Sequence, residues 1–127
     1  MSDRPVRIVL DASAIVAFTR GSIDVGEVIA EVNDEYAVAG LPVLCLVEAK
    51  GSVADGDRLE LLVSHTATRV LAPHPGDWQA LAVVYHSVGR LDAASAVLAA
   101  IDLDCQVLTG RPGLYAGLDG GGPIIAF

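Results

Sequence analysis

The feature that most constrains the fold of this chain is an alternation of short apolar runs with longer stretches of helical hydrophobic spacing. Strand-like runs cover residues 6–10, 68–71, 105–108 and 123–127. Because strands that alternate with helices pair most readily as a parallel sheet covered on both faces, we predict a three-layer α/β/α sandwich. In such a sheet, ligands bind beyond the carboxyl ends of the strands.

Helical spacing and turn residues between these runs predict the covering helices. We expect helices over residues 11–19, 23–32, 43–49, 55–63, 77–88, 91–103 and 112–117. Pro42 suits the first turn of a helix, where its missing N–H is not needed. The chain length and the single series of alternating elements predict one domain over residues 1–127.

The charge balance excludes one class of nucleic-acid protein. The chain has 16 acidic and 8 basic residues, a formal charge of -8. Proteins that grip nucleic acid through a broad basic surface depend on many Lys and Arg contacts to phosphates. The imbalance therefore disfavours such a surface, but it leaves room for a nucleic-acid enzyme whose positive charge comes from metal ions.

The sequence indicates a cytoplasmic protein. No run of eighteen or more apolar residues is present to span a membrane, and the amino-terminal residues lack the apolar region of a signal peptide. The two cysteines, Cys45 and Cys105, form no zinc-binding or redox pattern. We interpret them as small apolar side chains in a reducing compartment.

Three acidic residues occupy unusual positions. Asp11 ends the first strand, Glu48 lies in the apolar helix VLCLVEA, and Asp92 opens an Ala-rich helix. Asp11 also suits the N-cap of the following helix, and Asp92 suits the first turn of its own. A carboxylate on an otherwise buried helix, such as Glu48, usually points into a site or a paired network.

A parallel sheet would bring these three acids together. Carboxylates gathered above the strand ends repel one another, so they either take up protons or bind a divalent cation. An all-oxygen site made of carboxylates favours Mg²⁺ or Mn²⁺. The sequence therefore predicts a metal site formed by Asp11, Glu48 and Asp92.

Three segments of the chain resemble a known family. IVLDASAIVAF, LPVLCLVEA and LDAASAVLAAIDLDCQVLTGRP follow in the order and spacing of a VapC-type PIN domain. The resemblance runs from Val6 to about Tyr115, and its specificity comes from the ordered combination of short motifs. It implies a sandwich around a parallel sheet, metal-dependent cleavage of RNA, an antitoxin protein as partner, and a homodimer.

The resemblance assigns roles to individual residues. Asp11, Glu48 and Asp92 match the first three catalytic acids of the family, which hold Mg²⁺ or Mn²⁺. Ser13 matches a hydroxyl that orients the first acid. Thr109 begins the motif in which relatives carry a fourth acid, and we count Ser13 and Thr109 among the candidate substrate-binding residues.

The sequence departs from the family at that fourth position. Relatives commonly have Thr-x-Asp, whereas this chain has Thr109-Gly110-Arg111. An arginine in place of an aspartate changes the local charge by two units and should weaken metal binding. Arg111 could instead pair with Asp11 or Asp92 where a metal would otherwise bind.

Three basic residues flank the motifs: Lys50, Arg90 and Arg111. We hypothesise that they form a small phosphate-binding rim on an otherwise acidic surface, and the alternative for Lys50 and Arg90 is an ordinary solvated charge at a helix end.

The sequence thus supports two functions. One is a metal-dependent endoribonuclease, the toxin of a toxin–antitoxin pair. The other is a catalytically degraded PIN domain that acts as a binding or dimerisation module, and Arg111 is the feature that favours it.

Overall fold

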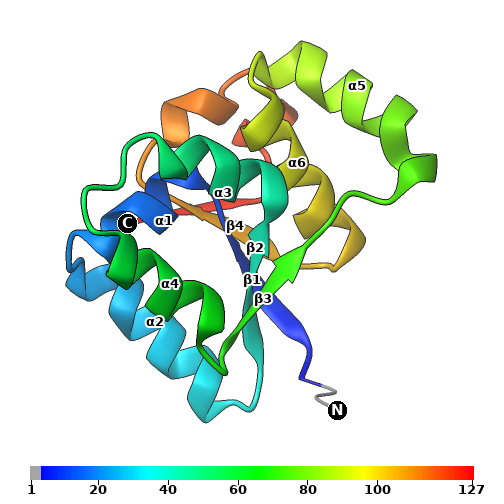
Figure 1. Ribbon diagram of the computed structural model, residues 1–127. Helices are drawn as coiled ribbons and strands as arrows, with labels where there is room; N and C mark the ends of the chain where they lie inside the picture. The colour runs from blue at the N-terminus through cyan, green and yellow to red at the C-terminus, as the bar shows by residue number, and fades with distance from the viewer. Residues whose placement is uncertain (1–3) are drawn as a thin grey trace.

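A five-stranded parallel sheet forms the centre of the computed structural model, which describes residues 4–127 (Figure 1). The spatial order of the strands is β3-β2-β1-β4-β5, and every neighbouring pair is parallel. The strands are β1 (Val6–Leu10), β2 (Val38–Pro42), β3 (Thr68–Leu71), β4 (Gln106–Thr109) and β5 (Ile124–Ala126).

Within residues 4–127, six α-helices and three short 3₁₀ helices connect the strands. The α-helices are α1 (Ala12–Thr19), α2 (Ile23–Asp34), α3 (Val43–Lys50), α4 (Gly56–Ser64), α5 (Trp78–Val88) and α6 (Leu91–Asp102). The 3₁₀ helices are η1 (Pro75–Asp77), η2 (Pro112–Tyr115) and η3 (Asp119–Gly121).

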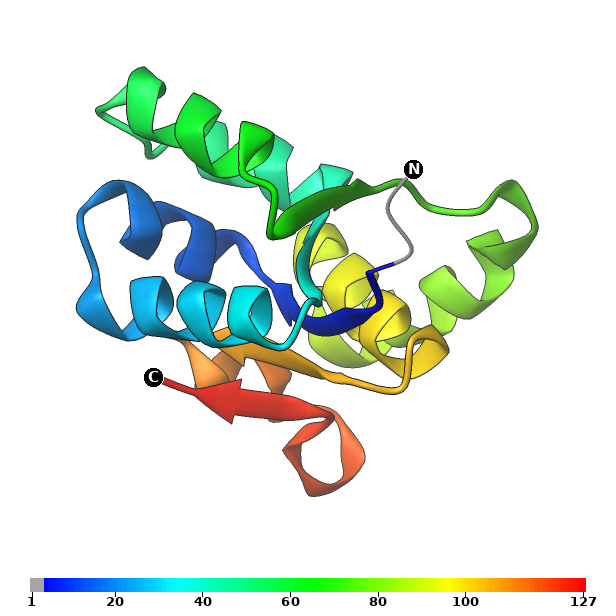
Figure 2. The same cartoon turned by 90° about the horizontal axis from the view of Figure 1, so that it is seen from below.

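The helices form the outer layers of the predicted α/β/α sandwich. Helices α1 and α2 lie on one side of the sheet, and α5 and α6 lie on the other (Figure 2). Helix α6 packs against β1, β2 and β4, with α5 outside it. Helix α3 contacts both α1 and α6, so it joins the two layers beside the carboxyl ends of the strands. The predicted fold class is confirmed.

The number of strands differs from the sequence prediction. The sequence prediction assigns no strand between residues 32 and 43, because Gly40 and Pro42 usually interrupt strands and Pro42 suits the first turn of a helix. The segment Val38–Pro42 is β2, a strand buried along its whole length between β1 and β3. A Cβ at Gly40 would lie 2.5 Å from Cδ1 of Leu71, so the glycine allows β3 to pack closely. Pro42 ends the strand and is the N-cap of α3, so the chain leaves the sheet directly after it.

The core consists of aliphatic side chains from the central strands and the inner faces of the helices. Val9, Leu10, Leu41, Val107 and Leu108 are almost fully buried in the sheet. The short apolar runs have no polar alternation because both faces of a parallel sheet are covered.

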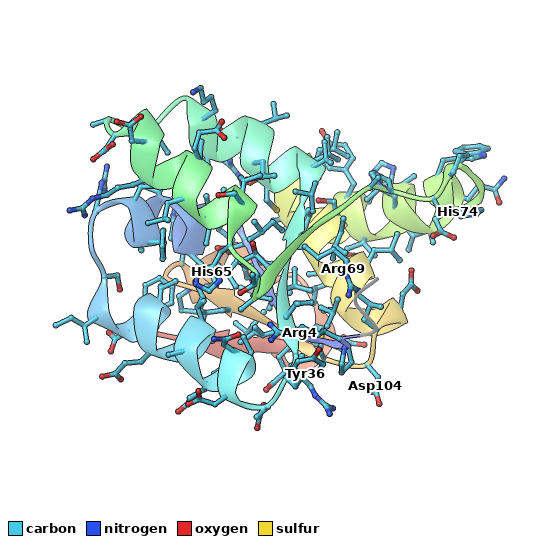
Figure 3. All side chains as sticks on the ribbon, turned by 60° about the horizontal axis from the view of Figure 1, so that its bottom comes forward. Arg4, Tyr36, His65, Arg69, His74 and Asp104 are labelled. Carbon is cyan, nitrogen blue, oxygen red and sulfur yellow. The ribbon has the colours of Figure 1, made fainter. Side chains whose placement is uncertain are left out.

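The amino ends of the strands carry their own polar cluster. The guanidinium of Arg4 lies over the ring of Tyr36, 4.3 Å from its centroid, and Arg69 donates to the Arg4 carbonyl at 2.6 Å. Arg4, Tyr36 and Arg69 lie close together, with Asp104 nearby (Figure 3). Asp104 precedes β4, so this cluster marks the sheet edge opposite to the carboxyl ends.

Within residues 4–127, the helices are too short or too polar to cross a lipid bilayer.

Candidate functional site

A cavity of about 550 Å³ lies at the carboxyl ends of the strands, and the three predicted acids line it. Asp11 directly follows β1, Glu48 is on α3, and Asp92 is in the first turn of α6. These elements lie far apart in the sequence, and only the parallel sheet brings them to one edge.

Asp11 is buried, with 2% of its surface exposed, and both of its carboxylate oxygens accept hydrogen bonds. Oδ1 accepts from the Ser13 hydroxyl at 2.6 Å and from the backbone N–H of Ala14 at 3.0 Å. Oδ2 accepts from the Tyr115 hydroxyl at 2.6 Å. This network meets the hydrogen-bonding requirement of a carboxylate removed from water.

The two sequence interpretations of Asp11 prove compatible. Its bond to Ala14 makes it the N-cap of α1, and the same side chain lines the cavity. A carboxylate has about four lone-pair positions, of which these three bonds use three. One acceptor position on Oδ2 therefore remains available.

Glu48 and Asp92 are joined by a single arginine. Arg90 Nη2 lies 3.1 Å from Glu48 Oε1, and Arg90 Nε lies 3.2 Å from Asp92 Oδ1. Nη2 also donates to Asp92 Oδ2 at 3.5 Å. The hydrogen bond that Arg90 donates to Asp92 raises the pKa of the Arg90 guanidinium, and the charges of Asp92 and Glu48 act in the same direction.

Two buried side chains fix the backbone beneath Asp92. The Ser95 hydroxyl donates to the Asp92 carbonyl at 2.7 Å, and the Cys45 thiol donates to the same oxygen at 3.2 Å. Burial raises the pKa of the Cys45 thiol well above its ordinary value. Cys45 therefore remains a neutral thiol that links α3 to the start of α6, and both cysteines are free.

Hydroxyl groups connect the end of β1 to the end of β4. Ser13 Oγ lies 3.3 Å from Thr109 Oγ1 and accepts from the backbone N–H of Gly110 at 2.9 Å. Thr109 Oγ1 accepts from the N–H of Arg111 at 2.9 Å. Thr109 is fully buried and does not line the cavity, so its contact with the site passes through Ser13.

The basic residues divide between the cavity and the outer surface. Arg90 and Arg111 line the cavity together with Arg20, which sequence reasoning did not single out. Lys50 is exposed and is not among the lining residues, so the proposed rim of three has Arg20 in the place of Lys50. Three arginines match the three acids, and the cavity has no formal net charge although the chain is strongly acidic.

Arg111 lines the cavity without pairing to Asp11 or Asp92. Within residues 4–127, neither Asp11 nor Asp92 forms an ion pair with Arg111, and Asp92 pairs with Arg90 instead. Among the residues that the structure describes, Asp11, Glu48 and Asp92 are the acidic residues of the cavity lining. Asp102 lines a different cavity.

The donor set suits a hard divalent cation but is not gathered around one point. In the described part of the chain, no three His, Cys, Asp or Glu side chains form a group that could hold a metal ion. Mg²⁺ nevertheless needs only one or two protein carboxylates, with waters and substrate phosphates completing its shell. Oδ2 of Asp11 and the half-exposed Glu48 provide such oxygens, so the residues fit the ion chemically.

Tyr115 is the main site residue that sequence reasoning missed. It is fully buried, and burial and the charge of Asp11 raise the pKa of its hydroxyl. It ends η2, the short helix after β4. A buried tyrosine needs a hydrogen-bond partner, but the sequence does not indicate that the partner is Asp11.

A second cavity, of about 380 Å³, lies between the ends of β2 and β3 and the helices α5 and α6. Its lining is mostly apolar and includes Leu44, Pro73, Trp78, Leu81 and Leu98. Trp78 is exposed over 66% of its surface. Asp11, Glu48 and Asp92 do not line this cavity.

Comparison with known proteins supports the fold. No protein-family model and no curated protein matches the chain. The crystal structure of PAE2754 from Pyrobaculum aerophilum is similar, with a TM-score of 0.68 and 18% sequence identity, over 95% of this chain and 89% of that one. At this identity the likeness concerns the fold alone.

Proposed function

We propose that this protein is a metal-dependent endoribonuclease that hydrolyses phosphodiester bonds in RNA. The observation that carries the proposal is the convergence of Asp11, Glu48 and Asp92 on one cavity at the carboxyl ends of a parallel sheet. The resemblance of the three surrounding segments to VapC-type PIN domains supports the same activity.

Mg²⁺ or Mn²⁺ held by Asp11, Glu48 and Asp92 would supply a Lewis acid and an activated water for hydrolysis. Asp11 is the most firmly positioned of the three, because Ser13, Ala14 and Tyr115 leave it little freedom to rotate. Glu48 is half exposed and lines the cavity from α3.

The remaining polar residues of the cavity serve the substrate. Arg20 and Arg111 are exposed at the cavity and provide positive charge for phosphate groups, as Arg side chains do in many nucleic-acid sites. Ser13 and Thr109 hold the loop after β4 against the start of α1. Lys50 is exposed on α3 outside the cavity lining and is the weakest member of the proposed substrate-binding set.

The same resemblance suggests the biological setting. We propose a toxin that acts in the cytoplasm, with an antitoxin protein as its inhibitor and a second copy of the chain as its partner. The two free thiols suit a reducing compartment.

A second function is favoured by the arginines. Arg90 already compensates Glu48 and Asp92, and Arg111 stands where relatives carry an acid. A cavity neutralised by its own side chains suits a catalytically degraded domain that binds a partner or dimerises. The nuclease requires Asp11 for RNA cleavage, whereas the degraded domain cleaves no RNA.

The deciding experiment measures cleavage of a fluorescent single-stranded RNA by the wild type, Asp11→Asn and Glu48→Gln in Mn²⁺. We expect each substitution to lower the cleavage rate by more than about 100-fold. Even replacing a residue that only hydrogen-bonds to a metal ligand typically lowers metal affinity or activity by about 10–100-fold. Asp102→Asn, which removes an acid from the other cavity, serves as the matched control and should retain the rate.

Equal cleavage by wild type and Asp11→Asn would contradict the proposal, since the activity would then come from elsewhere. Absence of cleavage in the folded wild type would favour the degraded domain. A gain of Mn²⁺-dependent cleavage in Arg111→Asp would then identify the missing fourth acid as the cause.

A further inference from the structure

Arg90 connects two of the acids that line the cavity. It is the N-cap of α6, two residues before Asp92, and its backbone is extended. From there the side chain reaches Glu48 on α3 as well as Asp92 on its own helix. One guanidinium therefore contacts two of the three candidate metal ligands, which come from different elements.

We propose that Arg90 is an internal counter-ion that a divalent cation must displace, so that it sets the cation concentration at which the site becomes occupied. This inference rests on the proposed function, because it concerns the same three acids. Arg90 holds Glu48 and Asp92 together without metal and leaves them when the metal binds.

Arg90 and a bound cation would compete for the same two carboxylates. Arg90 engages Oε1 of Glu48 and both carboxylate oxygens of Asp92. A cation bound by both carboxylates would compete for these oxygens, and its charge would repel the guanidinium beside it. We expect this repulsion to move the guanidinium away from the two carboxylates when the cation binds between them.

The surroundings of Arg90 permit its departure. Its side chain is 36% exposed and that of Glu48 is 53% exposed, so both can move into solvent. The interactions that its guanidinium makes within the described residues are with these two acids. Asp92, by contrast, is 8% exposed and its backbone is held by Ser95 and Cys45, so the carboxylate stays in place.

Without Arg90, the cavity would hold Glu48 and Asp92 as adjacent uncompensated charges. Such a pair attracts a dication more strongly than the compensated pair does. Arg20 provides a matched control: it lines the same cavity, and within residues 4–127 it forms no ion pair with the acids. Loss of Arg20 removes the same charge from the cavity without freeing a carboxylate.

The test compares Mn²⁺ affinity, by calorimetry, of the full-length wild type, Arg90→Gln and Arg20→Gln. Couplings between competing sites are commonly 5–150-fold, so we expect Arg90→Gln to bind Mn²⁺ about tenfold more tightly. Arg20→Gln should change the affinity by less than about threefold, as its charge acts from a greater distance through solvent. Arg90→Lys keeps the charge but lacks the planar fork, and it should fall between wild type and Arg90→Gln.

A second readout follows Arg90 directly. In the wild type, the Nε–H resonance of Arg90 should shift during titration with Mg²⁺ as the contact with Asp92 is lost, at the same concentrations at which Mg²⁺ binds. An unchanged resonance at full occupancy would overturn the displacement.

The outcomes separate this inference from the proposed function. If Asp11-dependent Mn²⁺ binding is equal or weaker in Arg90→Gln, the counter-ion role is wrong and the nuclease proposal stands. If Arg90→Gln tightens Mn²⁺ binding but no RNA is cleaved, the counter-ion role stands and the nuclease proposal fails. If neither form binds Mn²⁺, both are wrong.

Discussion

Tyr115 and Asp11 form the least replaceable contact of the site. The tyrosine is fully buried, and its hydroxyl donates to Oδ2 of a carboxylate that is 2% exposed. A hydrogen bond to a charged group contributes about 1.5–3 kcal/mol to stability, and more is lost when a buried charge keeps no partner. The residue that positions the first acid is thus also a stabilising one.

Tyr115→Phe should therefore show a pH-dependent effect on stability. Burial and the charge of Asp11 raise the pKa of Tyr115 in the folded state above its ordinary value of 10.0. Below about pH 10 the tyrosine hydroxyl is protonated in both the folded and the unfolded chain, and its full contribution to stability is present. Above that pH the tyrosine ionises first in the unfolded chain, so the free energy of unfolding falls by about 1.4 kcal/mol per pH unit.

Urea unfolding between about pH 8 and pH 11 measures this effect. Wild type should be more stable than Tyr115→Phe at the lower pH, and the difference should shrink as the pH rises above the ordinary tyrosine value. Cys45 also has a raised pKa, but it is present in both proteins and cancels. A difference that stays constant across the range would contradict the assignment.

At the scale of elements, the short helix η2 connects the sheet edge to the outer layer. Gly117 follows it, and a Cβ there would overlap the backbone carbonyl oxygen of Ser87 at the end of α5. Because a backbone atom cannot rotate away as a side chain can, the close approach requires glycine. This contact fixes η2, and with it Tyr115, against α5.

Gly117→Ala should lower the free energy of unfolding by about 1–3 kcal/mol through overpacking against α5. Gly113→Ala is the matched control, since nothing lies within 4 Å of a Cβ at Gly113 and the residue is in the same short helix. The control should change stability by less than about 0.5 kcal/mol. Equal effects in chemical denaturation would show that the contact with Ser87 is unimportant.

Across the whole molecule, positive charge is concentrated where the acids meet. Three of the eight basic residues, Arg20, Arg90 and Arg111, line the cavity, while the chain as a whole carries a formal charge of -8. The remaining bases include Arg4 and Arg69 at the opposite edge of the sheet. Under the proposed function, the phosphates of RNA would therefore find their main contacts at this cavity.

This distribution predicts a shallow salt dependence of RNA binding. Each phosphate contact on a single strand contributes about 0.7 to the slope of log K against log salt, so three arginines give a slope no steeper than about −2. Fluorescence anisotropy of a labelled RNA, with EDTA present to prevent cleavage, measures it. A slope steeper than about −4 would require a basic surface elsewhere on the molecule, contrary to this charge distribution.

Sequence patterning predicts most of the elements. The apolar run at β1 reflects a strand that is buried on both faces, and the apolar spacing in α2, α5 and α6 reflects helices that bury one face. Both patterns can be read directly along the chain. The missed strand, β2, depends on tertiary packing. Gly40 is tolerated there because Leu71 fills its empty side, and this neighbour is 31 residues away in the sequence.

The same division applies to the site. Asp11, Glu48 and Asp92 can be selected from the sequence. Asp11 ends an apolar strand, Glu48 lies inside an apolar helix, and Asp92 opens an Ala-rich helix. Tyr115 and Arg20 cannot, because a buried tyrosine and an exposed arginine have many ordinary roles. Tyr115 belongs to the site through its hydrogen bond to Asp11, and Arg20 belongs to it by lining the cavity; both relations join residues far apart in the chain.

By itself, the sequence determined the layered α/β fold and the placement of three acids at one edge, because hydrophobic periodicity and strand ends are local properties. Only the tertiary structure decided what those acids contact: Tyr115 for Asp11, and Arg90 for Glu48 and Asp92. The physical reason is that hydrogen bonds and ion pairs act over a few ångströms, and those distances exist only once distant elements have packed together.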